Sequence, residues 1–271
     1  KLNIGPFKPS VLKQILQDYN PGYTNEDLLC LYMFSGGVAK YVSLLMDAGA
    51  VTKKDMFDYV FGITSPFLFD GKEVLISEIG KDYGIYFSIL QLISGDFTTQ
   101  SEIDSVIQKN TGAYLHNLEN VFGVIKPVKP LFSKPQSRNV RWQIVDEYMR
   151  FYFRYIFANQ SMIELGQHRM LEELALGDYE TFTGKTLESY FSAKIKEESR
   201  ITALGGWWDR KSGNEIDIIA LNSMDRICKI YEVKRQRKKI DMAQLEDKSG
   251  VFCRNIPGYK IEFAGLCIED M

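Results

Sequence analysis

The sequence contains few of the residues on which several common kinds of site depend. Only two histidines occur, His116 and His168, which argues against a histidine-based hydrolase or a histidine-rich metal site. The four cysteines stand far apart without a CxxC pair, so neither a zinc site nor a disulfide framework is indicated. Reduced thiols are typical of cytoplasmic proteins, and a cytoplasmic location is therefore expected.

Long apolar runs and a strong charge of one sign are also missing. The sequence has no run of about 18 apolar residues and no signal-peptide pattern at its start, so no membrane association is expected. The formal net charge is −2, so any surface that binds nucleic acid must be local. Apolar residues make up 45% of the chain, which is typical of a folded protein. The length allows two or three domains of roughly 100–150 residues.

Residues 1–80 have a helical pattern. Ser10 is a candidate N-cap of a first helix, which Asn20-Pro21-Gly22 ends. Three more helices are expected at about 25–33, 38–48 and 53–60. The side chains expected on the apolar face of the first helix are Val11, Ile15, Leu16 and Tyr19.

Residues 81–158 have the element order of a winged helix-turn-helix domain. Helices are expected over 83–93, 102–108 and 113–121, the second of them capped by Thr99 or Ser101. The β-prone runs 125–128 and 140–144 follow, and in such domains the third helix enters the major groove while the hairpin reaches the backbone. The third helix is not basic, so a structural or protein-contact role stays equally open. A helix over 146–158 is aromatic on nearly every face, which indicates burial rather than base stacking.

Residues 159–271 change to an α/β pattern. A long helix is expected over 179–198, and a shorter one over 241–248. The strands are expected over 205–209, 215–221, 227–234 and 261–268. The order helix, three strands, helix, strand predicts an α/β domain with a mixed sheet.

Two carboxylates and a lysine are predicted to meet on the hairpin of the second and third strands. Side chains alternate along a strand, so Glu232 and Lys234 project together, and Glu215 and Asp217 share a face of the strand before. A turn-like connection at 222–225 would place Asp217 next to Glu232. From spacing alone, an ordinary salt-bridged hairpin is the other interpretation.

This group of side chains suits phosphodiester hydrolysis. Mg²⁺ or Mn²⁺ prefers carboxylates, waters and phosphate oxygens, so Asp217 and Glu232 are the expected metal ligands, with the Val233 carbonyl as a third. A bound metal would activate a water molecule, and Lys234 would stabilise the developing oxyanion. Glu188, on the preceding helix, would complete the acidic cluster.

Basic side chains near this site and in the wing are candidates for phosphate contacts. The run 234–239 follows the site directly, where a solvated loop is the other interpretation. Gln244 opens the next helix and is expected near the metal. One of Trp207 and Trp208 is expected to pack in the core while its neighbour faces outward. The candidates for nucleic-acid contact are Lys126, Arg138, Arg141, Arg235, Arg237 and Lys238.

Asp217 followed by Glu232-Val233-Lys234, with Glu188 upstream, resembles the PD-(D/E)XK nuclease superfamily. More specifically, Gly206-Trp207-Trp208-Asp209-Arg210-Lys211 leading into Asn214-Glu215-Ile216-Asp217 looks like a C-terminal domain of unknown function. That domain is attached to prokaryotic ATPases of the archaeal ATPase family.

Two further segments are similar to the same family. Residues 142–154 resemble its aromatic helix after the winged helix. Ser35-Gly36-Gly37-Val38-Ala39-Lys40-Tyr41 resembles the Gly-Gly-x-Pro-x-Tyr segment of its ATPase lid, with Ala39 in place of the usual proline. Together, the resembling segments span most of the chain.

The resemblance implies three domains: an ATPase-lid-like region (1–80), a winged helix (81–158) and a PD-(D/E)XK nuclease-like domain (159–271). Relatives begin with a P-loop core of the AAA+/STAND type, which this sequence lacks. ATP is therefore expected only in that core, which would be the partner of these domains. Gly184-Lys185-Thr186 imitates the end of a Walker A motif, but Tyr179 stands where the motif requires glycine.

The function expected from the resemblance is a Mg²⁺-dependent nuclease acting on DNA or RNA under the control of an ATPase. One alternative is a non-catalytic module that binds nucleic acid or regulates a protein on an inactive nuclease scaffold. Another is an antitoxin-like or assembly partner of another protein.

Overall fold

The computed structural model describes residues 5–71, 75, 79, 83–134, 136–209 and 213–271. The chain forms two compact units, each made of separate stretches. The α/β unit contains residues 1–32, 129–139 and 180–271, and the helical unit contains residues 33–128 and 140–179. The expected boundary between 80 and 81 lies outside the described residues, and the division into three domains stays a prediction.

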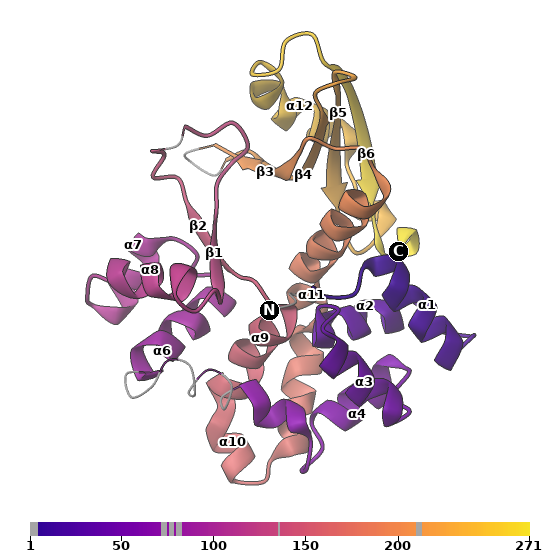
Figure 1. The fold of residues 1–271 in the computed structure, drawn as a ribbon, viewed down its shortest axis with the longest axis vertical. Coiled ribbons are helices and arrows are strands. Elements are labelled where there is room, and N and C mark those ends of the chain that lie inside the picture. Colours follow the sequence, from indigo (N-terminus) through magenta and orange to yellow (C-terminus); the bar gives the residue numbers. More distant parts are fainter. Residues whose placement is uncertain (1–4, 72–74, 76–78, 80–82, 135, 210–212) are drawn as a thin grey trace. The chain divides into compact units, whose positions relative to one another are not determined.

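The α/β unit is built on a four-stranded mixed sheet, as expected. Its order is β3-β4-β5-β6, antiparallel up to β5, with β6 parallel to β5. Helix α12 packs against one face of this sheet (Figure 1). The elements of the unit are α1 (Pro9–Tyr19), most of α2 (Asn25–Ser35), the C-terminal part of α11 (His168–Glu198), β3 (Ala203–Trp208), β4 (Glu215–Asn222), β5 (Ile227–Val233), η5 (Arg237–Lys239), α12 (Met242–Cys253), β6 (Lys260–Leu266) and η6 (Ile268–Asp270).

The core of the α/β unit lies between the sheet and α12. Ile219 on β4 and Ile230 on β5 are paired across the ladder and are both fully buried. They pack with Leu245 and Phe252 of α12. Burying a side chain of this size contributes about 1.5–3 kcal/mol. The alternation that predicted β4 and β5 therefore arises because α12 covers one face of these two strands.

The expectation that one of the two tryptophans faces outward is wrong. Both are buried: Trp207 is 8% exposed and Trp208 is 5% exposed. Trp207 packs beside Phe252, while the Trp208 indole donates a hydrogen bond of 2.9 Å to the Asn139 side chain. The loop before Asn139 runs beside β3 at the sheet edge, where Leu131 donates its N–H to the Gly206 carbonyl and packs against the core under α12. Strand alternation alone could not predict this loop.

The helical unit contains three helices followed by an antiparallel hairpin, as predicted, and the winged-helix assignment stays a prediction. Thr99 forms a capping box with Glu102 at the second of these helices. The elements of the unit are α3 (Ala39–Asp47), α4 (Lys53–Val60), η1 (Pro66–Leu68), α6 (Tyr83–Ser94), α7 (Gln100–Ile107), α8 (Gly112–Asn120), β1 (Ile125–Val128), β2 (Arg141–Ile144), α9 (Glu147–Phe151), η3 (Tyr152–Ile156), η4 (Phe157–Asn159), α10 (Gln160–Glu164) and the start of α11.

The aromatic segment after the hairpin is buried, as expected, but it is not one regular helix. An α-helical turn (α9) is followed by a π-helical turn (η3) and a 3-10 turn (η4). Tyr148 lies 4.1 Å from the ring of Tyr41, measured between centroids. Gly36 has a positive φ of 54° and lies directly against Glu147. The lid-like segment and the aromatic segment are therefore neighbours within this unit.

Helices α1 and α11 differ most from their predictions, and α12 extends to Cys253, beyond its predicted end at 248. Helix α1 begins at Pro9, and the Ser10 hydroxyl contacts Glu197 instead of capping the helix. Its buried stripe contains Leu12 and Leu16, whereas Val11 is 39% exposed and Tyr19 is 55% exposed, so the predicted apolar face is confirmed at Leu16 and wrong at Val11 and Tyr19. Packing selects the i, i+4 leucine pair over the neighbouring stripe.

Helix α11 begins at His168 rather than at 179 and contains Gly184-Lys185-Thr186 in its interior. That position is helical instead of a phosphate-binding loop. Within the described parts of the chain, every helix is too short or too polar to cross a bilayer.

Candidate metal centre

The candidate centre lies where the ladder between β4 and β5 ends. The last backbone pair of this ladder joins Ile218 to Tyr231. One residue further, Asp217 accepts a hydrogen bond of 2.8 Å from the Val233 N–H through its side-chain Oδ2. A carboxylate thus takes a position that a backbone carbonyl holds in a regular ladder. The predicted juxtaposition of Asp217 with the end of β5 is present.

A bulge in the sheet places the Asp217 side chain. Gly205 pairs with Ile219 but Trp207 pairs with Ile216, so β4 has one extra residue between these pairs. Gly206 stands opposite the bulge, and a Cβ there would lie 3.2 Å from the Asp217 and Ile216 carbonyl oxygens. Bulges re-aim side chains and are frequent beside active sites. The glycine is therefore needed for the close approach of the two strands.

Glu232 is held between two lysines. Its Oε1 lies 2.6 Å from the Lys234 Nζ, and its Oε2 accepts a hydrogen bond from Lys248 on α12. The Lys234 Nζ also lies 3.7 Å from the Asp217 Oδ2. The Glu232 side chain is 6% exposed and that of Asp217 is 13% exposed, while Lys234 keeps 37% of its surface. The ammonium group of this partly exposed lysine therefore already contacts both carboxylates.

The two carboxylates respond in opposite directions to this environment. Burial raises the pKa of Asp217, and this outweighs the Val233 N–H and the Lys234 ammonium, which lower it. Burial also acts to raise the pKa of Glu232, but the hydrogen bonds from Lys234 and Lys248 outweigh it and lower the pKa. Paired carboxylates with diverging pKa values are frequent at functional sites.

Glu188 lies close enough to Asp217 for the charge of that carboxylate to change its pKa. Burial, followed by the Asp217 charge, raises the pKa of Glu188 to about 8. Within the described residues, no three His, Cys, Asp or Glu side chains form a group that could hold a metal ion. The role of Glu188 as a third acidic member stays a prediction.

The donors present fit a magnesium-like ion better than zinc. Zinc usually takes three or four protein ligands of the His, Cys or carboxylate type. Mg²⁺ usually takes one or two carboxylates and keeps several waters. Asp217 and Glu232 offer two carboxylates, and the Lys234 ammonium shows that one cation reaches both. These two residues would hold the ion, provided that the lysines move away from Glu232.

Lys248 is the site residue that the sequence reasoning missed. Gln244 is exposed at the start of α12, and its expected place near the metal stays a prediction. Lys248 is four residues further, on the same face of the helix, and contacts Glu232. The i, i+4 spacing from Gln244 is the signal that would have identified it.

The basic candidates lie in different surroundings. Lys126 and Arg138 are exposed, Arg141 is half-buried, and Lys238 is exposed on η5. Arg237 is 56% exposed and pairs with Asp270 at 2.6 Å. Arg235 has a side chain only 13% exposed and contacts Thr183 and Glu26. Its guanidinium group is directed into the protein, unlike those of its neighbours.

The segment after the site is fixed by a close contact on β6. Gly265 pairs with Glu232, and a Cβ on Gly265 would lie 2.5 Å from the Ile240 side chain. Because the isoleucine side chain is restricted at χ1, it could not move away from such a Cβ without strain. Gly265 therefore allows the chain after Lys234 to fold back over the sheet.

Comparisons with known proteins give a family likeness without a function. Residues 152–245 match the model of a family described as "Archaea bacterial proteins of unknown function" (DUF234). This match includes Glu188, Asp217, Glu232 and Lys234 and ends before Lys248. Two further residues of the resembling segment, Arg210 and Lys211, lie outside the described residues.

The chain is also similar to an uncharacterized protein of Methanocaldococcus jannaschii. The two are 29% identical over 247 residues, which is 86% of this chain and 53% of the relative. The chain therefore spans about half the length of this relative. No solved structure matches the chain.

Proposed function

We propose that the α/β unit hydrolyses phosphodiester bonds of nucleic acid with Mg²⁺ or Mn²⁺. The observation that carries the proposal is the contact of one ammonium, that of the partly exposed Lys234, with both Asp217 and Glu232. These side chains converge from two strands at the open end of a ladder. The resemblance to PD-(D/E)XK nucleases assigns the same residues to the site.

Each side chain has a distinct task in this proposal. A bound Mg²⁺ would supply a water of lowered pKa and neutralise charge on the scissile phosphate. Asp217 and Glu232 bind the ion, and the Val233 N–H orients the Asp217 carboxylate. Lys234 donates hydrogen bonds to a phosphate oxygen as negative charge develops there. Lys248 positions Glu232 from the side of α12.

Control by an ATPase core is a further part of the proposal. The resemblance implies a P-loop core in the full-length relatives, and the uncharacterized relative is long enough to contain one beyond the matched region. ATP would then bind in that core and change the access of nucleic acid to the α/β unit. The exposed cations Lys126, Arg138 and Lys238 are suited to salt-sensitive phosphate contacts.

A non-catalytic scaffold is the second candidate, and one observation favours it. Both carboxylate oxygens of Glu232 already contact lysines, so this acid is electrically balanced without a metal. Such a site would be retained for stability while the unit binds nucleic acid. In that case binding would persist in EDTA and cleavage would be absent.

The test is a cleavage assay with duplex, single-stranded and branched substrates in Mg²⁺ or Mn²⁺. We expect cleavage by the unmodified protein and none by Asp217→Asn or Glu232→Gln. Asp247→Asn is the matched control, because it removes an exposed carboxylate from α12 without touching the site. Cleavage that persists in both site variants contradicts the proposal. Metal-independent binding without any cleavage supports the scaffold.

A further inference from the structure

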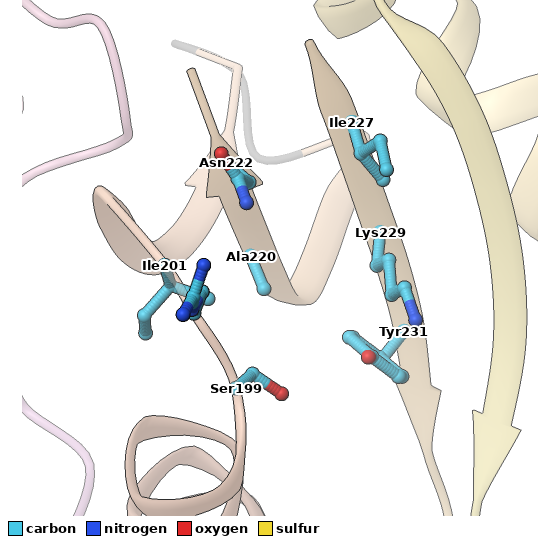
Figure 2. A pocket seen from close by; sticks show the side chains of 8 residues that line it. Ser199, Ile201, Ala220, Asn222, Ile227, Lys229 and Tyr231 are labelled. Carbon is cyan, nitrogen blue, oxygen red and sulfur yellow. The ribbon is translucent and has the colours of Figure 1, made fainter. Parts of the chain in front are cut away.

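A cavity of about 240 Å³ lies on the sheet face opposite α12. Ala220, Lys229 and Tyr231 line it, and along their strands they alternate with the residues packed under α12. Figure 2 shows Ser199 and Ile201 on the segment that leaves α11, facing Ala220 on β4, with Lys229 and Tyr231 on β5. The cavity is thus separated from Asp217 and Glu232 by the thickness of the sheet.

The inner part of the cavity is apolar. Ala220 is 4% exposed and forms part of its wall, and the partly buried side chains of Ile201 and Ile227 flank it. The Tyr231 side chain is partly buried, and burial raises the pKa of its hydroxyl, so the phenol is uncharged at neutral pH. An apolar wall with one aromatic ring suits a planar ring system.

Two cationic side chains also line the cavity, and none of the described residues that line it is acidic. Arg200 is exposed, and its guanidinium group suits bidentate recognition of phosphate. Lys229 keeps 52% of its side-chain surface, and its Nζ lies 3.6 Å from Glu262 on β6. Glu262 also pairs with Lys260 at 2.7 Å, so its negative charge is shared between two lysines.

We propose that this cavity binds a single nucleotide, with its base against Tyr231 and its phosphate between Arg200 and Lys229. The volume lies below the roughly 300–1,000 Å³ of pockets that enclose drug-sized ligands, so one ring fits inside while the phosphate stays at the open side. The site does not depend on the proposed nuclease activity, because it lies on the other face of the sheet. A free nucleoside monophosphate and the 5′-phosphorylated end of a strand share this chemistry.

Calorimetric titration in EDTA tests the site without any metal chemistry. The probes are AMP, CMP, orthophosphate, and a short oligonucleotide with and without a 5′-phosphate. We expect a nucleoside monophosphate or the 5′-phosphorylated oligonucleotide to bind at least about tenfold more tightly than orthophosphate, since stacking adds to the charge contact. Tighter binding of the monophosphate assigns a free nucleotide, and tighter binding of the oligonucleotide assigns a strand end.

Variants show whether binding occurs in this cavity. Arg200→Ala and Lys229→Ala should each weaken binding about tenfold or more, and Tyr231→Leu about fivefold or more. Glu262→Gln should strengthen binding, because it releases Lys229. Lys54→Ala and Tyr19→Leu are matched controls at exposed positions elsewhere, and thermal unfolding confirms that each variant folds.

Three results would overturn the proposal. They are no binding of any nucleotide probe at millimolar concentration, equal affinity for orthophosphate, and unchanged affinity in the Arg200→Ala, Lys229→Ala double variant.

Discussion

Each unit contains a buried charged cluster, and the two clusters are built differently. In the helical unit, Arg150 donates two hydrogen bonds, of 3.2 and 3.0 Å, to one oxygen of Glu147 one turn away. Both side chains are 10% exposed. In the α/β unit, Asp217, Glu232 and two lysines come from β4, the end of β5 and α12.

The difference separates a local ion pair from a convergent site. A pair at i, i+3 within one helix forms wherever that helix forms. The second cluster exists only when the whole sheet is assembled, and it leaves the Lys234 side chain 37% exposed. Its carboxylates have pKa shifts of opposite sign. We infer that the first cluster serves stability and the second serves binding or chemistry.

The largest expected effect is on stability, in the helical unit. Glu147→Ala leaves the buried Arg150 guanidinium without this carboxylate and should lower the free energy of unfolding by about 3–5 kcal/mol. Urea denaturation measures it. The double variant Glu147→Leu, Arg150→Met should recover much of the loss. A change below about 1 kcal/mol in the single variant would show that the pair is not structural.

The next effect is on activity, in the α/β unit. Lys234→Met should lower cleavage about 10²–10³-fold, because it removes the ammonium that faces the phosphate. The free energy of unfolding should change far less than in Glu147→Ala, since the Lys234 side chain is partly solvated. If Lys234→Met loses stability but keeps its cleavage rate, the second cluster serves stability rather than chemistry.

A smaller effect concerns pH and Asp146, which caps α9 through the Met149 N–H. Burial raises the pKa of Asp146 from 3.8 to about 6. The folded protein therefore binds more protons than the unfolded chain between these values, and its stability falls as pH rises from about 4 to about 6. Asp146→Asn keeps the cap acceptor and should remove this slope, gaining about 1–2 kcal/mol at pH 7 after solvent screening.

Thermal unfolding at several pH values between 4 and 7 measures this slope. Asp104→Asn, at a carboxylate that accepts hydrogen bonds from Thr111 in the same unit, is the comparison variant. A slope that is unchanged in Asp146→Asn would show that other groups produce it.

The smallest expected effect is at Lys248. Lys248→Met should lower cleavage about fivefold, because Glu232 loses one of its two lysine contacts while the proposed ion still holds it. The apparent affinity for Mg²⁺ should rise, since one competing cation is gone. Titration of the cleavage rate with Mg²⁺ measures both quantities. A lower Mg²⁺ affinity would contradict the positioning role.

The sequence predicts most of the sheet and the pairing at the site. Alternating apolar residues define β4 and β5, and the alternation also places Asp217 beside Glu232. What it misses depends on contacts distant in the chain. Lys248 approaches from another element, and the Trp208 indole is covered by the loop that contains Asn139. Local periodicity carries no information on such partners.

The sequence also does not predict which residues of the first helix are buried. Val11 and Leu12 are equally apolar, and the choice between their stripes is made by tertiary packing. The π-helical turn at Tyr152–Ile156 has the same origin, because aromatic burial on every side leaves no periodic pattern that specifies helix type.

A crystal of this protein soaked in Mn²⁺ tests the central claim most directly through anomalous scattering. The account predicts one ion bound by carboxylate oxygens of both Asp217 and Glu232 at about 2.0–2.2 Å, with a lysine displaced from Glu232. An anomalous map without a peak between these carboxylates at saturating Mn²⁺, with both lysines still in contact with Glu232, would contradict it.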